Sequence, residues 1–231
     1  PLKYYENNLS GLIYILQEID NLKKPFNFIF SSSATVYGQA KTLPITEEES
    51  IKQAESPYGN TKQISEEILH DYSKINSKIN VISLRYFNPI GAHNSVEIGE
   101  LPIGVPQNLL PFITQTAAGI HEKITVFGND YNTPDGTCIR DYIHVVDLAK
   151  AHIVAIENLI HKKSKSNYNI YNIGTGNGTS VLEMIKSFIK VTGLELNYII
   201  GPRRQGDVES AYADNSKAMK ELNWKAENSI E

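Results

Sequence analysis

The sequence has few of the residues that build disulfide frameworks or nucleic-acid interfaces. It holds one cysteine, Cys138, among 231 residues, which excludes an internal disulfide framework and a cysteine-based zinc cluster. Its 22 Lys and Arg against 26 Asp and Glu give a net charge of −4, whereas a nucleic-acid-binding protein is expected to carry a basic excess. With 41% hydrophobic residues, the composition is that of an ordinary globular protein, and no nucleic-acid partner is expected.

Long hydrophobic runs are also lacking. The longest uncharged run, residues 101–121, is interrupted by three prolines and several polar residues, so it cannot supply the roughly 20 apolar residues of a membrane span. The N-terminus carries Lys3 and Glu6 without the apolar centre of a signal peptide, so we expect a cytoplasmic protein that does not bind membranes. The six histidines show no metal-ligand spacing, and no metal is expected.

The chain begins at Pro1 rather than Met, so we expect a fragment or a processed product. At about 150 residues per domain, its length predicts one large domain or two interlocked lobes.

Helical and strand patterns alternate along the chain. Apolar residues recur every three or four positions near the N-terminus, and Ser56 with Pro57 is typical of a helix start. The first predicted elements are a helix at 3–23, a strand at 26–33, a helix at 57–74 and a strand at 80–86. This order is typical of a parallel, doubly wound α/β sheet. The later predicted elements are helices at 108–119, 147–161 (capped by Asp147), 180–191 and 215–223, with strands at 124–128, 140–145, 168–173 and 197–200.

One pair of side chains on the second helix could carry proton chemistry. Tyr58 and Lys62 lie four residues apart, so they share one helix face, and a nearby ammonium favours the phenolate. About one such pair is expected by chance among 13 tyrosines, and Tyr37 with Lys41 also matches, although in a non-helical segment. Ser33 ends the preceding strand, where ligands bind in doubly wound sheets, and could relay a proton beside the pair. The alternative is that residues 31–33 only form a strand-ending turn.

Several motifs make a family resemblance recognisable. The chain resembles the UDP-galactose 4-epimerases, which belong to the extended short-chain dehydrogenases/reductases, essentially over its whole length. The motifs that carry the resemblance are FIFSSSATVYG at 28–38, SPYGNTK at 56–62, LRYFNPIGAH at 84–93, FGNDY at 127–131, DGT at 135–137, RDYIHV at 140–145, YNIGTG at 171–176, PRRQGD at 202–207 and LNW at 222–224.

The resemblance implies NAD-dependent interconversion of UDP-galactose and UDP-glucose in galactose metabolism. Tyr58, helped by Ser33, would take the proton of the sugar 4-hydroxyl while the C4 hydride passes to NAD. The 4-keto sugar would then turn over and receive the hydride on its other face. Lys62 would hold the nicotinamide ribose and lower the pKa of Tyr58. A homodimer formed through the first two helices is also implied.

The resemblance further assigns binding residues. Arg140 and Arg204 would hold the diphosphate, although Arg203 and Arg204 could instead be a solvated surface pair. Arg85 is expected to be structural. The remaining assignments are Asn7, Ser33, Tyr58, Lys62 and Phe87 for the cofactor, and Asn88, Asn108, Leu109, Val126, Phe127, Asp207 and Ala211 for the substrate.

Ala211 falls where this family places a gate beside the sugar 2-position. A small residue there resembles members that also accept N-acetylhexosamines, so we expect activity on UDP-GlcNAc and UDP-GalNAc as well. The alternative is that Tyr212 swings into the gap.

The sequence departs from the family at its start. Family members open with a strand and a Gly-rich turn that holds the dinucleotide pyrophosphate, and no such segment precedes Pro1. The Gly-rich loop at 174–178 lacks the G-x-G-x-x-G spacing and is expected to be structural. We therefore expect these 231 residues alone to bind NAD weakly or not at all.

The expected fold is a Rossmann-like doubly wound sheet with a smaller α/β substrate lobe. Residues 1–88 would be the remaining half of the NAD-binding domain and residues 89–231 the substrate lobe, with about 140–175 packing back on the NAD domain. A nucleotide-sugar dehydratase or decarboxylase is disfavoured, because it needs a carboxylate beside the strand-ending serine and residues 33–37 have none. An inactive, truncated UDP-sugar-binding protein remains the other alternative.

Overall fold

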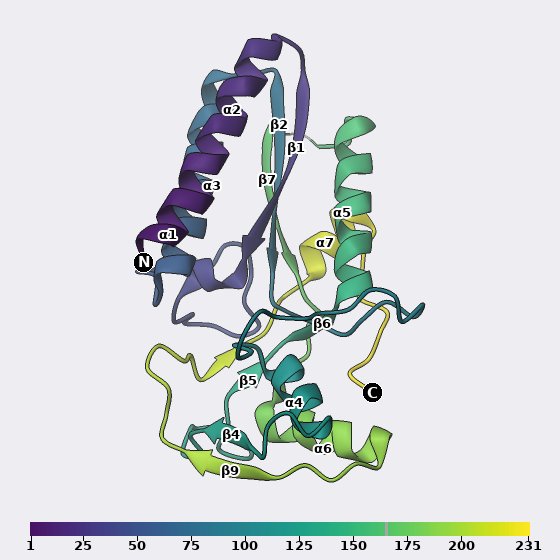
Figure 1. The fold of residues 1–231 in the computed structure, drawn as a ribbon. Coiled ribbons are helices and arrows are strands. Elements are labelled where there is room, and N and C mark those ends of the chain that lie inside the picture. The colour runs from purple at the N-terminus through teal and green to yellow at the C-terminus, as the bar shows by residue number, and fades with distance from the viewer. Residues whose placement is uncertain (165) are drawn as a thin grey trace.

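A parallel sheet forms the centre of the computed structural model, which describes residues 1–164 and 166–231. Within these residues the sheet has the strand order β1-β2-β7, formed by β1 (Phe26–Ser33), β2 (Ile79–Tyr86) and β7 (Tyr168–Ile173) (Figure 1). β1 and β2 pair over their full length, with Ser33 opposite Tyr86, so their carboxyl ends are level. The predicted α/β class and these three strands are confirmed.

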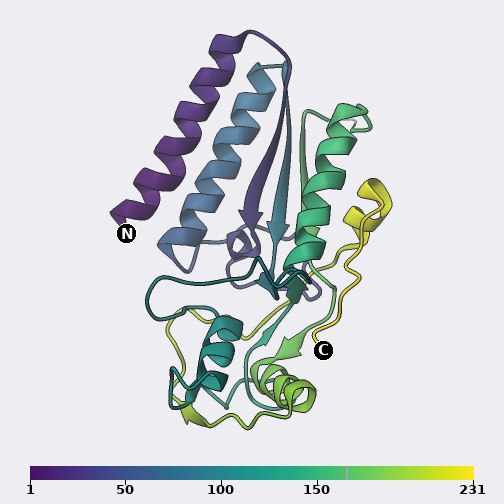
Figure 2. The same cartoon turned by 45° about the vertical axis from the view of Figure 1, so that its right-hand side comes forward.

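Helices cover both faces of this sheet (Figure 2). On one face lie α1 (Leu2–Tyr5), α2 (Gly11–Leu22) and α3 (Pro57–Ile75), and on the other α5 (Val145–Ile160) and α7 (Ser216–Leu222). Alternate residues of β2 serve the two faces: Val81 packs with α2 and α3, whereas Leu84 packs with α5 and with Trp224. The result is the three-layered arrangement expected of a doubly wound sheet.

The helix predicted at 3–23 is present over residues 2–22, but it is not α-helical throughout. A π-helical segment, η1 (Glu6–Ser10), joins α1 to α2. Within it the Asn8 side chain donates a hydrogen bond to Thr61 Oγ1 of α3 at 2.9 Å, while Asn7 is exposed. A π turn holds an extra residue compared with an α turn, so it changes which side chains face α3.

The start of α3 was predicted correctly, whereas the start of α5 was not. Ser56 Oγ accepts a hydrogen bond from the Gly59 amide at 3.1 Å, with Pro57 in the first turn. Asp147 is not the cap of α5, because the helix begins two residues earlier and His144 Nδ1 accepts a bond from the Val146 amide at 3.1 Å. The buried Asp147 carboxylate instead accepts hydrogen bonds from the backbone amides of the C-terminal segment.

A second group of elements lies beyond the carboxyl ends of the sheet (Figure 1). Its core includes Ile113, Val126 and Ile185. The elements are β3 (Asn88–Ile90), α4 (Leu109–Ala117), β4 (Ile124–Phe127), β5 (Ile139–Arg140), β6 (Tyr142–His144), β8 (Thr179–Ser180), α6 (Val181–Thr192), β9 (Tyr198–Gly201) and β10 (Ser210–Ala211), and the 3-10 helix η2 (Ala34–Tyr37) follows β1.

The strand predicted at 140–145 is divided at Asp141. β5 pairs with β10 and β8, whereas β6 pairs with β3. The buried Asp141 carboxylate accepts hydrogen bonds from the amides of Thr175, Gly176 and Ala213 at 2.8, 3.0 and 3.1 Å. The Gly-rich loop at 174–178 is therefore held by a carboxylate of its own chain.

Across the part of the chain that the structure describes, helices lack the combination of length and apolar character that crossing a membrane requires.

Candidate functional site

Ser33, Tyr58 and Lys62 meet at the carboxyl end of β1. Lys62 Nζ donates a hydrogen bond to the Ser31 carbonyl at 2.8 Å and lies 5.5 Å from the centre of the Tyr58 ring. Ser33 Oγ accepts bonds from the Thr35 amide at 3.2 Å and from the Thr35 hydroxyl at 3.0 Å. Because both bonds use its oxygen as an acceptor, the Ser33 hydroxyl hydrogen is available to donate to a phenol or a substrate oxygen.

Burial is the largest effect on the pKa values of Tyr58 and Lys62. It raises the pKa of the Tyr58 phenol, and a hydrogen bond from Ser33 acts in the opposite direction without cancelling that effect. Burial also lowers the pKa of the Lys62 amine. The lowering of the Tyr58 pKa expected from Lys62 is therefore not seen. Burial is the largest effect on the Tyr58 phenol, and Lys62 Nζ, 5.5 Å from the centre of its ring, donates to the Ser31 carbonyl.

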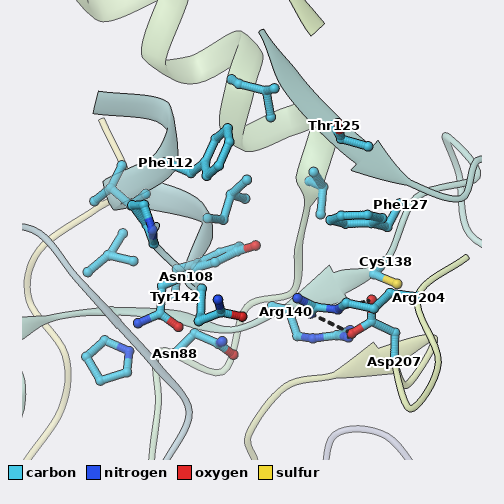
Figure 3. A pocket seen from close by; sticks show the side chains of 18 of the residues that line it. Asn88, Asn108, Phe112, Thr125, Phe127, Cys138, Arg140, Tyr142, Arg204 and Asp207 are labelled. Atoms are coloured by element: carbon cyan, nitrogen blue, oxygen red, sulfur yellow. Dashed lines mark hydrogen bonds and ion pairs between the residues drawn. The ribbon is translucent and has the colours of Figure 1, made fainter. Parts of the chain in front are cut away.

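A cavity of about 410 Å³ lies among the elements beyond the sheet (Figure 3). Seven residues predicted to bind substrate line it: Asn88, Asn108, Leu109, Phe127, Arg140, Arg204 and Asp207. Lining residues that the sequence interpretation missed include Ile90, Phe112, Thr125, Cys138, Tyr142 and Val181.

Val126 does not line this cavity. Its side chain is 1% exposed and packs in the core of the second group of elements. The β4 residues that line the cavity are Ile124, Thr125 and Phe127, of which Figure 3 labels the last two.

Two arginines and one carboxylate form a charged wall of the cavity (Figure 3). Arg204 donates to Asp207 from Nε at 3.1 Å and from Nη2 at 2.8 Å, and Arg140 Nη2 lies 3.7 Å from Asp207 Oδ1. The side chains of Arg140 and Asp207 are only 15% and 13% exposed. Guanidinium groups suit phosphate oxygens, so this wall can hold a diphosphate if Asp207 yields part of its contact.

The side chain of the adjacent Arg203 does not line the cavity. Its Nε donates to Asp130 Oδ1 at 2.7 Å, and its guanidinium lies 4.1 Å from the centre of the Tyr131 ring. The guanidinium of Arg204 lies 5.5 Å from the centre of the Phe127 ring, at the cavity. The structure thus places Arg204, which the resemblance assigned to the diphosphate, at the cavity, whereas Arg203 does not line it.

The predicted gate residue Ala211 and the predicted nicotinamide residue Phe87 belong to one apolar cluster. Ala211 is paired with Arg140 and packs, partly buried, on a cluster that contains Phe87. Neither residue lines the cavity. Tyr212 does not fill the space beside Ala211, because its ring lies against Gly178, where an added Cβ would come within 3.0 Å of it.

The residues at the end of β1 fit one part of a nicotinamide dinucleotide. Lys62 uses one of its three donors on Ser31, so two remain for ribose hydroxyls. Within the described residues, the amides of the Gly-rich loop at 174–178 do not offer a free cradle, because Asp141 binds those of Thr175 and Gly176. The same part of the chain shows no group of three His, Cys, Asp or Glu side chains that could hold a metal ion. The fit is therefore to the nicotinamide ribose end of the cofactor.

The fold and site define a Rossmann-like α/β protein with a Ser, Tyr and Lys group at a strand end beside an arginine-walled cavity. A family model described as "GDP-mannose 4,6 dehydratase" matches residues 1–231. The UDP-glucose 4-epimerase of Drosophila melanogaster is 49% identical over 232 residues, which cover 100% of this chain and 65% of that protein. The chain belongs to the UDP-glucose 4-epimerase family, within the broader group that the family model describes.

Solved structures agree with this assignment. The UDP-glucose 4-epimerase of Bifidobacterium longum, in complex with NAD+ and UDP, matches with a TM-score of 0.93 at 48% identity, covering 100% of this chain and 67% of that one. The UDP-Glc/GlcNAc 4-epimerase of Campylobacter jejuni matches with a TM-score of 0.81 at 36% identity, covering 100% and 68%. The chain thus spans about two thirds of the length of these relatives.

Proposed function

We propose that this chain belongs to an enzyme that interconverts UDP-galactose and UDP-glucose with NAD as cofactor. The observation that carries the proposal is the meeting of Ser33, Tyr58 and Lys62 at the end of β1, next to the cavity walled by Arg140 and Arg204, in a chain of the UDP-glucose 4-epimerase family. Bound NAD would supply a hydride acceptor and donor for C4 of the sugar.

The chain's own residues would do the proton transfer and the positioning. The Tyr58 phenolate takes the proton of the sugar 4-hydroxyl and returns it to the opposite epimer, while the Ser33 hydroxyl hydrogen-bonds to the same oxygen. Lys62 donates to the nicotinamide ribose with the protons that Ser31 leaves free. Inversion then needs room for the 4-keto sugar to turn beside the site.

Binding of the nucleotide would be the task of the cavity. Arg140 and Arg204 hold the diphosphate, and Asp207 holds the uridine ribose. Phe127 offers an aromatic face to uracil. The other residues that we propose at the substrate or cofactor are Asn88, Asn108, Leu109, Ala211 and the backbone of Val126 at the substrate, and Phe87 and Asn7 at the cofactor.

The wider setting is part of the same proposal. We place the enzyme in galactose metabolism in the cytoplasm and expect a homodimer, supported by exposed apolar side chains on the outer side of α2, such as Tyr14 and Ile15. We assign residues 1–88 to the NAD-binding domain and 89–231 to the substrate lobe, with about 140–175 returning to the sheet through α5 and β7.

A dehydratase reaction is a weaker candidate. It needs a carboxylic acid beside Ser33. The first acid after Ser33 in the chain is Glu47, whose carboxylate accepts a hydrogen bond from the Asn172 amide at 2.7 Å. Burial raises the pKa of Glu47, but its contact commits it to β7 rather than to the strand end of Ser33.

Substrate breadth and reaction type are tested together. We expect the enzyme supplied with NAD to convert UDP-galactose to UDP-glucose and, because Ala211 is small, UDP-GalNAc to UDP-GlcNAc. Replacing Ala211 with Tyr should remove the second conversion and spare the first, because the bulkier ring occupies space beside Arg140 and Phe87. Product analysis by liquid chromatography measures both rates. Absence of UDP-glucose formation contradicts the proposed function, and an unchanged N-acetylhexosamine rate contradicts the gate.

The sole cysteine provides an independent probe of the cavity. Cys138 lines it and is 5% exposed, so a thiol reagent should reach it only slowly. We expect UDP to slow that reaction about a hundredfold at a concentration of about one hundred times Kd, since an occupied site is protected. The measurement is the labelling rate with UDP or, as a control, ADP. Cys138→Ser should abolish labelling, and equal rates with and without UDP would place the nucleotide elsewhere.

A further inference from the structure

A buried ion pair ties helix α3 to the sheet two turns beyond Tyr58. Arg85 of β2 donates to Glu66 of α3 from Nε to Oε1 at 2.9 Å and from Nη2 to Oε2 at 2.5 Å. The two side chains are 3% and 5% exposed. Ser32 of β1 donates a further hydrogen bond to the same carboxylate. A single group on α3 therefore holds both neighbouring strands, and one of its contacts is the residue next to Ser33.

The rest of the buried face of α3 carries few fully buried apolar side chains. Leu69 is its one large apolar side chain with full burial, and the other buried members are small or polar. Interlocking apolar side chains normally fix the rotation and the sliding of a helix on a sheet, and small polar ones do so weakly. The buried positions are Gly59, Thr61, Gln63, Ser65, Glu66, Leu69 and Ser73. Leu69, with partly buried Ile68 and Tyr72, packs in the apolar cluster with α2 and β2, whereas directional polar contacts dominate the buried face of α3 from Gly59 to Glu66.

We propose that Glu66 and Arg85 are positioning residues that hold Tyr58 against Ser33. Tyr58, Lys62 and Glu66 are spaced four residues apart, so they lie within about 80° of one helix face at 100° per residue. Fixing Glu66 on β1 and β2 therefore fixes the direction of Tyr58 about 12 Å away along the helix, at 1.5 Å per residue. The roles of Tyr58 and Ser33 rest on the proposed function, but their contact is measurable without cofactor or substrate.

The variants must separate a positioning role of the ion pair from its contribution to stability. Removing one partner leaves a buried charge unpaired and destabilises the fold, whereas replacing both with apolar side chains is often neutral for stability. The informative variant is therefore the double replacement Glu66→Met with Arg85→Met. Glu66→Asp is a second one, because it keeps the charge pair and shortens the link by one methylene. Glu67→Gln, at an exposed position on the same helix, is the matched control.

The readout is the coupling between Ser33 and the Tyr58 phenol. Protein labelled with 3-fluorotyrosine, whose phenol titrates at lower pH, is followed by fluorine NMR, and Tyr58→Phe identifies the resonance. In the parent protein Ser33→Ala should raise the pKa of Tyr58, because it removes a hydrogen bond that lowers it. In the double variant and in Glu66→Asp this response should be lost, while Glu67→Gln should keep it.

Each outcome decides the inference. A response to Ser33→Ala that persists in Glu66→Asp, or in a double variant with native circular dichroism, overturns it. With NAD and UDP-galactose, the variants should lower kcat about a hundredfold with KM unchanged, because misplacement by about 1 Å has that cost and the cavity residues lie on other elements. These rates are measured on the complete enzyme to which we propose that this chain belongs. Absence of turnover in that enzyme contradicts the proposed function alone, since the fluorine coupling is measured independently of it.

Discussion

Replacing Tyr58 with Phe should lower epimerase turnover about 10²- to 10⁴-fold, which is the usual contribution of a positioned acid or base. The change removes only the phenol oxygen, so the ring remains near Lys62 and the edge-on contact with Tyr4 can persist. The rate of UDP-glucose formation from UDP-galactose measures the effect. UDP affinity, measured by calorimetry, should stay the same, because Tyr58 is not among the residues that line the cavity.

The raised pKa of Tyr58 also predicts the direction in which epimerase turnover changes with pH. Burial raises the pKa of Tyr58 above its ordinary value of 10, so the phenolate is the minor form at neutral pH and its fraction grows tenfold per pH unit. The rate limited by proton removal should therefore rise with pH. Ser33→Ala should move this rise to higher pH. Tyr72→Phe is a suitable control, since its phenol is bonded to α2 far along the helix. A flat profile together with near-normal turnover in Tyr58→Phe would exclude the phenol as the base.

The pattern of elements was largely predictable from the sequence, because periodicity reports which faces are buried. The meeting of Ser33 with Tyr58 and Lys62 was also predictable, since carboxyl ends of parallel strands share one edge with the start of the following helix. The pKa of Tyr58 was not. Spacing shows that a lysine is near, but not how deeply the phenol is buried, and here burial is the largest effect on its pKa.

Errors arose where local signals compete with long-range contacts. The carboxylate of Asp147 was a plausible cap by its place at a predicted helix start, but it bonds to a segment about 80 residues later. A continuous strand at 140–145 was expected, because nothing local reveals that Asp141 joins two sheets through amides more than 30 residues away. The π segment at Glu6–Ser10 likewise has no periodic signature over so few residues.

Arg203 contacts Asp130, whereas Arg204 contacts Asp207 at the cavity. Replacing Arg204 should therefore lower nucleotide affinity much more than replacing Arg203. Arg204→Gln should weaken UDP binding by about a hundredfold, since charge-assisted hydrogen bonds contribute about 1.5 to 3 kcal/mol and 1.4 kcal/mol is tenfold in Kd. The change also frees Asp207, whose carboxylate is then balanced only by Arg140 and repels the diphosphate. Calorimetry with UDP measures Kd.

Arg203→Gln is the matched control, with the same change of charge one residue away. Because its guanidinium is engaged by Asp130 and Tyr131, UDP affinity should change by less than about threefold, the scale of screened surface charges. Added salt should weaken UDP binding to the parent protein more than to Arg204→Gln, which has one fewer cation at the diphosphate. If the two variants lose affinity equally, net charge rather than the cavity wall attracts the nucleotide, and the diphosphate does not lie between Arg140 and Arg204.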